Sequence, residues 1–194
     1  MQRQNRSAFE ALSSFRSYEA WLLFRPAIES ALICGKWIDD PKNARIWAER
    51  RLKPKPYRKA YQGTALQSRS LPLSPQIQAV LAKINDDFVH PNPNYYERHL
   101  SFRPLDERHV GVTLGYFDDE PHAEASVYSL FHLTLVVQGA LRDMLANFFP
   151  ALSGLDLGHA PFLSEYEPRV TALAQTHPEV HDTLKDLGLW RCTI

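Results

Sequence analysis

The sequence predicts a mostly α-helical fold, a helical bundle with one inserted antiparallel β-hairpin, in a single domain that spans residues 1–194. Three observations support this fold class. Long stretches place apolar residues three and four positions apart, as a helix with one buried stripe requires. Ser, Asp and Pro stand where such helices would begin. One stretch, at about 98–117, alternates apolar and polar residues in the manner of paired strands.

The first predicted helix covers Ser7–Asp39. From Trp21 onward it is apolar on nearly every side, which indicates a central helix with several neighbours. Pro26 lacks the N–H that would bond to Leu22, so we expect the helix to bend or break there.

Two shorter helices are expected next. Asp40 and Pro41 open the first, in the stretch DDPKNARIWAERRL, and a basic connector with a helical turn near Tyr57–Tyr61 follows it. Ser74, followed by a proline, caps the second, and a His-Pro pair at His90 ends it.

The predicted hairpin consists of the stretches RHLSFR and HVGVTLGY, joined by PLDER. A lone hairpin is marginally stable in water. We therefore expect one of its faces to lie on the helices.

The longest predicted helix runs from a cap at Asp118 or Asp119 to Phe149 and should pair with the first helix in the core. Ser164 and Glu167 form a capping-box pattern that opens a further helix. Another is expected from Thr176 to a glycine at 188.

Composition limits the function classes. Lys and Arg together number 22, as do Asp and Glu, so the whole-chain charge indicates neither nucleic acid nor an anionic membrane as partner. Cys34 and Cys192 lack C-x-x-C spacing, which argues against a disulfide framework and a cysteine-ligated zinc. The longest apolar stretch, Leu130–Val137, is too short to span a bilayer. We expect a cytoplasmic protein that is neither exported nor embedded in a membrane.

Arg25 and Glu29 stand four residues apart on the most apolar predicted helix. A buried charge needs a partner, so we expect these two side chains to pair. Two interpretations stay open. The pair is a structural ion pair, or Arg25 anchors an anion such as phosphate.

This Arg-x-x-x-Glu pair, the Asp-Pro that follows it, the short Trp-containing helix and the helix that ends in His-Pro together resemble a bacterial branch of the HEPN superfamily. The resemblance covers about 15–94 and the long helix near 120–149. It implies a helical bundle, commonly a homodimer, and RNA cleavage or nucleotide binding in defence, toxin or RNA-processing systems.

The HEPN catalytic signature is an arginine followed after four to six residues by a histidine near a helix end. Asn85 and His90 have this spacing, but asparagine replaces the arginine. The resemblance therefore leaves two alternatives. His90 works with an arginine from elsewhere, with Arg25 and Asn85 completing the candidate catalytic group, or the nuclease chemistry is absent.

The strongest local excess of positive charge lies at 45–59, in RIWAERRLKPKPYRK. Cations that contact phosphates, together with aromatic faces that stack on bases, are typical of single-stranded RNA binders. The candidate nucleic-acid-binding residues are Arg50, Arg51, Lys53, Lys55, Arg58 and Lys59. A solvated helix and loop is the alternative interpretation.

Other site motifs are weak or missing. His177 and His181 have the i, i+4 spacing of helical zinc ligands but lack the adjacent glutamate and a third ligand, so we expect no metal. No phosphate loop, dinucleotide fingerprint or G-x-S-x-G motif occurs in the sequence, and we expect no cofactor.

The function expected from these features is an RNA- or nucleotide-associated HEPN-like protein, including the case of a degenerate ribonuclease. The alternative is a non-catalytic helical interaction module that forms a homodimer or binds a partner protein. Whether the chain is an enzyme stays open.

Overall fold

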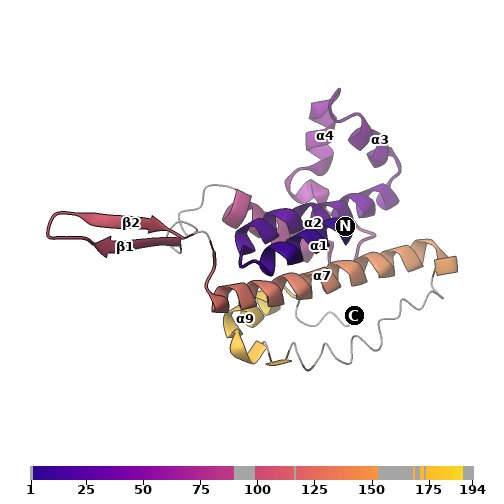
Figure 1. Ribbon diagram of the computed structural model, residues 1–194. Helices are drawn as coiled ribbons and strands as arrows, with labels where there is room; N and C mark the ends of the chain where they lie inside the picture. The colour runs from indigo at the N-terminus through magenta and orange to yellow at the C-terminus, as the bar shows by residue number, and fades with distance from the viewer. Residues whose placement is uncertain are drawn as a thin grey trace.

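The computed structural model describes residues 2–89, 99–115, 117–152, 168, 171–172 and 174–189. A bundle of helices forms the body, and a two-stranded β-hairpin and a short helical arm project from it (Figure 1). The predicted fold class, a helical bundle with an inserted antiparallel hairpin, is confirmed.

The N-terminal region contains two helices, α1 (Gln2–Leu12) and α2 (Ser17–Asp39), where one interrupted at Pro26 was predicted. The chain turns between them at Phe15, whose φ of 56° lies in the left-handed region. The predicted position of the break was therefore wrong by about three helical turns.

Pro26 lies inside α2 without ending it. Phe24, Ala27 and Ile28, which flank the proline, are almost fully buried. Their burial stabilises the helix by more than the one backbone hydrogen bond that Pro26 removes.

The start of α2 is fixed by a residue 101 positions away. The carboxylate of Asp118 accepts hydrogen bonds from the backbone N–H of Ser17, at 2.7 Å, and from its hydroxyl. The backbone N–H of Asp118 in turn donates to the carbonyl of Phe15 at 2.9 Å. Asp118 thus caps α2, and ties it to the chain that leaves the β-hairpin.

After α2 the chain forms the short helices α3 (Lys42–Ala48) and α4 (Pro54–Tyr61) and the 3₁₀ turn η1 (Gly63–Leu66). The backbone N–H of Lys42 donates to the side chain of Asp40 at 2.9 Å, in agreement with the predicted helix start. We call residues 42–61 the helical arm, because α3 and α4 extend away from the body (Figure 1).

The next helix, α5 (Ser74–Ile84), continues into a π-helical turn, η2 (Asn85–Val89). Ser74 begins this helix as predicted but does not cap it. Its hydroxyl accepts a hydrogen bond from the backbone N–H of Ser68 at 2.8 Å, which fixes the preceding loop. The predicted helix end at His90 lies outside the described residues.

The long helix is α7 (Glu120–Phe148), and its cap is Asp119, whose side chain accepts from the backbone N–H of His122 at 3.0 Å. A 3₁₀ turn, η3 (Pro150–Leu152), follows it. Near the C-terminus lies α9 (Pro178–Asp186), after which the φ of 69° at Gly188 ends the helix as predicted. The capping box predicted at 164–167 lies outside the described residues.

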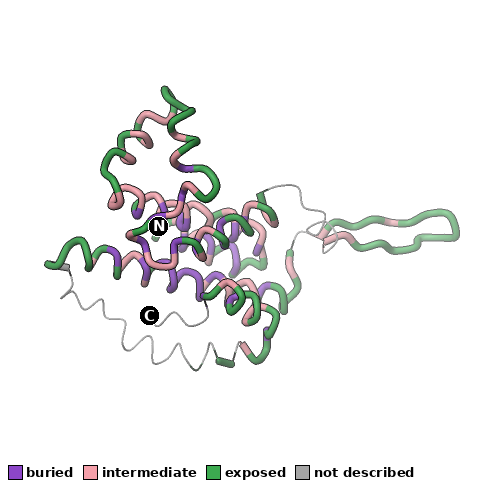
Figure 2. Tube along the Cα trace, turned by 180° about the vertical axis from the view of Figure 1, so that it is seen from behind, coloured by how far each residue is buried: buried purple, intermediate pink, exposed green. Residues whose placement is uncertain are grey.

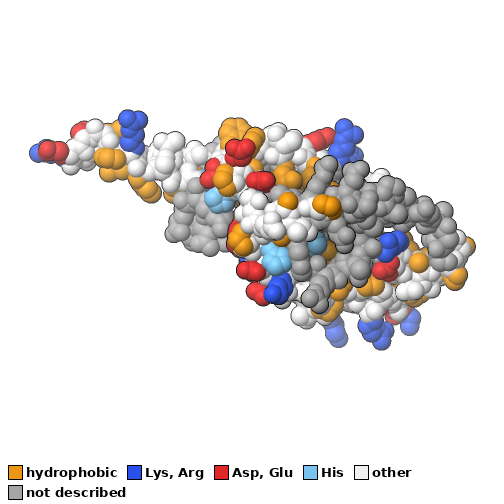
Figure 3. All heavy atoms as spheres, turned by 90° about the horizontal axis from the view of Figure 1, so that it is seen from below, with side chains coloured by type: hydrophobic (Ala, Val, Ile, Leu, Met, Phe, Trp, Pro, Cys, Tyr) orange, Lys and Arg blue, Asp and Glu red, His pale blue; other side chains and the backbone are white. Residues whose placement is uncertain are grey.

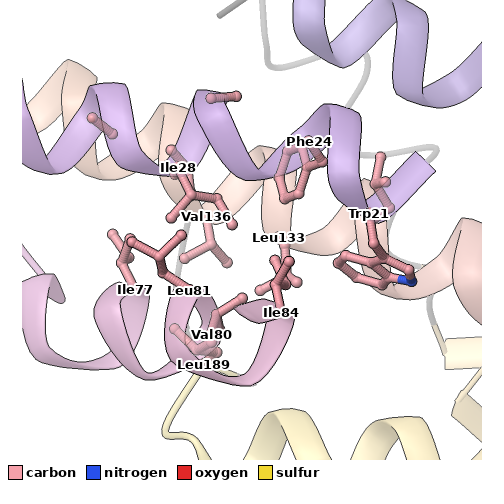
Figure 4. Packing of buried hydrophobic residues seen from close by; sticks show 14 of the residues in the cluster. Trp21, Phe24, Ile28, Ile77, Val80, Leu81, Ile84, Leu133, Val136 and Leu189 are labelled. Carbon is pink, nitrogen blue, oxygen red and sulfur yellow. The ribbon is translucent and has the colours of Figure 1, made fainter. Parts of the chain in front are cut away.

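The core lies between α2, α5 and α7, where the buried residues concentrate (Figure 2). Figure 4 shows Phe24 and Ile28 of α2 together with Ile77 and Leu81 of α5 and Val136 of α7. Burial of each such side chain contributes about 1.5–3 kcal/mol. The predicted pairing of the first and longest helices in the core is confirmed.

His132 connects the core to the C-terminal segment. Its imidazole is 4% exposed, and its Nε2 lies 3.0 Å from the carbonyl oxygen of Leu189. Burial lowers the pKa of this histidine, and the hydrogen bond to Leu189 opposes that shift. The neutral ring therefore serves as a donor to the backbone here.

The hairpin has the predicted position, with β1 (Leu100–Pro104) paired antiparallel to β2 (Val110–Leu114). It extends away from the helices (Figures 1 and 2), and Phe102 is 67% exposed. The expectation that one face lies on the helices was wrong. The strand pattern carries no signal for the direction in which the hairpin points.

Within the described ranges, no helix has both the length and the apolar character that a membrane crossing needs.

Candidate functional site

The helical arm carries the local excess of positive charge. Five of the six predicted nucleic-acid-binding residues are exposed: Arg51, Lys53, Lys55, Arg58 and Lys59. The sixth, Arg50, is partly buried, because its guanidinium lies 3.7 Å from the centre of the Trp47 ring. The arm therefore presents its cations to solvent at the end of a projecting element.

One acidic residue balances part of this charge. Glu49 accepts hydrogen bonds from Lys53 Nζ at 2.8 Å and from Arg45 Nε at 3.0 Å. These bonds, with that from Lys53 the larger contribution, lower the pKa of the Glu49 carboxyl. Lys53 is thus already paired, which leaves Arg51, Lys55, Arg58 and Lys59 with no ion pair to any residue in the described ranges.

The aromatic residues of the arm hold it to the body. Tyr61 is 5% exposed, donates from its hydroxyl to the carbonyl of Asn43 at 2.6 Å and accepts from Trp37 Nε1 at 3.1 Å. Tyr57 stacks on Tyr61 with ring centres 5.3 Å apart. Arg50 covers a face of Trp47. These contacts favour a structural role for the aromatic residues over base stacking.

Two of the three predicted catalytic residues meet at the end of α5. Arg25 Nε donates to the side-chain oxygen of Asn85 at 2.6 Å, and Arg25 Nη1 donates to Glu29 at 3.2 Å. Asn85 opens the π-helical turn η2, a geometry that occurs often at functional sites. The third residue, His90, lies outside the described residues.

Arg25 and Glu29 form an ion pair with each other, as predicted. The pair is only half-buried, with side-chain exposures of 31% for Arg25 and 30% for Glu29. Water therefore screens the charges in part, and the ion pair contributes less than a fully buried one. Two of the three guanidinium nitrogens of Arg25, Nε and Nη1, thus donate to side chains of the same chain.

Replacing Arg25 by alanine should lower the free energy of unfolding by about 1–2 kcal/mol, because it removes one ion pair and one charge-assisted hydrogen bond, both partly screened. The matched control is Arg6→Ala, which removes another i, i+4 pair with Glu10, in which Arg6 is 82% exposed. That change should cost less than about 0.5 kcal/mol. Urea denaturation measures both, and equal midpoints for the two variants would contradict this account.

A cavity of about 960 Å³ opens beside this end of the bundle, at the root of the hairpin. Its walls are mainly apolar and come from α2, α5 with η2, α7, α9 and the hairpin; Trp21, Phe88, Leu133, Val180 and Leu184 are examples. His99 and Asp118 lie on its polar side, with His99 Nε2 3.7 Å from the Asp118 carboxylate. Sequence reasoning missed this cavity, since five separate segments form it.

The two histidines with zinc-ligand spacing make other contacts. His177 is 5% exposed and lies 3.3 Å from Glu124, while His181 lies 3.4 Å from Asp182. In the part of the chain that the structure describes, no group of three or more His, Cys, Asp or Glu side chains is placed to hold a metal ion.

Comparisons of the chain with protein-family models, curated proteins and solved structures found no match. Its function must therefore be inferred from the geometry of its own residues.

Proposed function

We propose that this protein binds single-stranded RNA through the phosphate backbone, with the helical arm as the contact surface. One observation carries this proposal: Arg51, Lys55, Arg58 and Lys59 are exposed on a projecting element and have no ion pair within the described ranges. Contacts to phosphates position RNA without reading its bases, so binding should be independent of sequence.

The arrangement of α4 supports the proposal. Lys55, Arg58 and Lys59 are separated by three and four residues and share one helical face. Tyr57 and Tyr61 pack together, and the hydrogen bond from Trp37 of α2 to the Tyr61 hydroxyl anchors the helix to the body. Like charges at such spacing destabilise a helix by about 0.2–0.5 kcal/mol per pair. An anionic ligand would relieve this repulsion.

The surroundings of Arg25 favour a protein that binds RNA without cleaving it, that is, a degenerate ribonuclease. The arginine of the HEPN signature is replaced by Asn85, and Arg25 is held by the carboxylate of Glu29 and the amide of Asn85. The carboxylate of Glu29 already offsets part of the positive charge of this guanidinium. We therefore propose that the site has lost the positive charge that the nuclease reaction needs.

Filter binding with a single-stranded oligouridine tests the proposal. The variant Arg51→Gln/Lys55→Gln/Arg58→Gln/Lys59→Gln should lose roughly tenfold or more in affinity at low salt, because four phosphate contacts disappear. The control variant replaces four exposed cations outside the arm by glutamine: Arg3, Arg6, Arg69 and Lys185. It should bind within about twofold of the wild-type protein, since it retains every proposed phosphate contact.

The RNA should stay intact in the same assay. An equal loss of affinity in both variants would contradict the arm as the binding surface. Cleavage by the wild-type protein that disappears in His90→Ala would instead contradict the degenerate site and restore His90 as a catalytic residue.

A further inference from the structure

The cavity at the root of the hairpin is too large to be a packing defect. Its volume is about 960 Å³, whereas voids larger than a water molecule are few in protein interiors. Pockets for small molecules have volumes of about 300–1,000 Å³ and mainly apolar walls with a few polar groups. Figure 3 shows hydrophobic, acidic and histidine side chains together where the hairpin joins the body. In size and composition, the cavity therefore resembles a small-molecule site.

Three aromatic side chains form one part of the cavity wall. Phe88 of η2 stacks on Trp21 of α2, with ring centres 5.8 Å apart and ring planes 23° apart. The Phe88 ring centre also lies 5.9 Å from that of Tyr18, three residues before Trp21. Leu133 of α7 and Val180 of α9 add aliphatic side chains. These walls can bury an aliphatic or aromatic group, and aromatic rings also attract a cation that lies over a ring face.

The ionisable side chains of the cavity wall carry an excess of negative charge. Lys83 is the only lysine or arginine among the described residues that line it, and its Nζ lies 2.9 Å from the carboxylate of Asp87. His99 and His122 are the described histidines of the wall. Even with both rings protonated, these three cations are outnumbered by the carboxylates. The described carboxylates of the wall are Asp87, Asp118, Asp119 and Glu179.

Two of these carboxylates are adjacent in the chain and held in place by hydrogen bonds. Asp118 accepts from the backbone N–H of Ser17 at 2.7 Å, and Asp119 accepts from the backbone N–H of His122 at 3.0 Å. The backbone bond, and then a second bond from the imidazole of His122, lower the pKa of the Asp119 carboxyl. Ser17 precedes Tyr18, so Asp118 lies beside the aromatic part of the wall. Negative charge and aromatic side chains thus meet at one end of the cavity.

We propose that this cavity binds a small amphipathic amine. The aliphatic or aromatic body of the ligand lies against the apolar walls, and its protonated amine lies at the end that carries Asp118 and Asp119. A fatty acid or a phosphate ester would fit less well, because its negative charge would meet carboxylates in a partly buried site. The ligand and the site are both separate from the RNA contact that we propose for the helical arm.

Isothermal titration calorimetry of the full-length protein tests the class of ligand. The probes are octylamine, octan-1-ol and octanoate, which share the same alkyl chain and carry a positive, a neutral and a negative end. Octylamine should bind with one molecule per chain and about tenfold more tightly than octan-1-ol, because the carboxylates attract its ammonium group. Octanoate should bind most weakly of the three.

A substitution that fills the cavity tests the location. Ala125 of α7 is half-buried and lines the cavity, so the phenyl group of Ala125→Phe would occupy part of the proposed ligand volume. We expect this variant to lose about tenfold or more in affinity for octylamine. The matched control is Ala146→Phe, a half-buried alanine of the same helix that is not among the lining residues. It should bind within about twofold of the wild-type protein, and urea denaturation checks that both variants fold.

Removal of charge provides an independent test, which stands even if Ala125→Phe does not fold. Asp118→Asn/Asp119→Asn keeps both helix caps, because an amide oxygen accepts the same hydrogen bonds. Its affinity for octylamine should fall about tenfold, to that for octan-1-ol, while the affinity for octan-1-ol stays the same. The control Asp182→Asn/Asp186→Asn removes two exposed carboxylates of α9 that do not line the cavity, and it should keep the preference for the amine.

Each contrary result overturns a stated part of the proposal. No binding of octylamine at millimolar concentration would remove the site. Octanoate bound as tightly as octylamine would remove the selection for a cation. Wild-type affinity in folded Ala125→Phe would place amine binding elsewhere, and a preference for the amine that survives Asp118→Asn/Asp119→Asn would remove these carboxylates from the site. RNA binding by the helical arm is independent of all four results.

Discussion

Replacing Phe24 by alanine should lower the free energy of unfolding by about 3–5 kcal/mol. Phe24 is 1% exposed and packs edge-on against Trp21, with ring centres 6.2 Å apart. Its removal loses buried apolar area and leaves a cavity among α2, α5 and α7, which neighbouring side chains fill only in part. Denaturation by urea, followed by circular dichroism, measures the change.

Phe148→Ala is the matched control, because it truncates the same residue type where the side chain is half-exposed at the end of α7. The expected loss is below about 1 kcal/mol. If the two variants unfolded at the same urea concentration, the placement of the core around α2 would be wrong.

Gly35→Ala should destabilise the protein by about 1–3 kcal/mol, although alanine favours helices. A Cβ atom at this position in α2 would lie 2.6 Å from the hydroxyl oxygen of Ser68 and 2.9 Å from the Cβ of Leu71. Ser68 cannot move away freely, because its hydroxyl accepts from the backbone N–H of Leu71 at 3.1 Å. The loop at 67–73 crosses α2 at this glycine, and the substitution would push it outward.

Gly139→Ala provides the opposite case. Apart from the backbone of α7 itself, no atom of the described residues lies within 4 Å of a Cβ placed at Gly139, so the gain in helix propensity decides the effect. This variant should be more stable than the wild-type protein by about 0.5–1 kcal/mol. Destabilisation of similar size at both glycines would contradict the close approach at Gly35.

Local signals predicted most of the helices and the hairpin. Pro75 in the first turn of α5, Asp119 before α7 and Gly188 after α9 all act through residues close in sequence. These residues set the ends of helices in the folded chain as they do in the sequence pattern, because the hydrogen bonds and φ angles involved are local.

The missed features depend on tertiary contacts. The start of α2 is set by Asp118, which lies 101 residues away, and Pro26 is tolerated because its neighbours are buried from several sides. None of these contacts can be inferred from residue spacing.

Candidate site residues were predicted in part. The resemblance suggested Arg25 as the arginine that joins Asn85 and His90 in a candidate catalytic group. Arg25 Nε donates to Asn85 at 2.6 Å, and a catalytic role for either residue stays a prediction. The basic stretch was evident from composition. The structural use of Tyr61, and the pairing of Lys53 with Glu49, required the folded arm.

The measurement that tests RNA binding by the arm most directly is the salt dependence of oligouridine affinity. Each phosphate contact on single-stranded RNA contributes about 0.7 to the slope of log affinity against log salt concentration. The arm variant lacking Arg51, Lys55, Arg58 and Lys59 should therefore show a slope shallower than wild type by roughly 3. Identical slopes, or wild-type protein that shows no salt-sensitive binding, would contradict the proposed function.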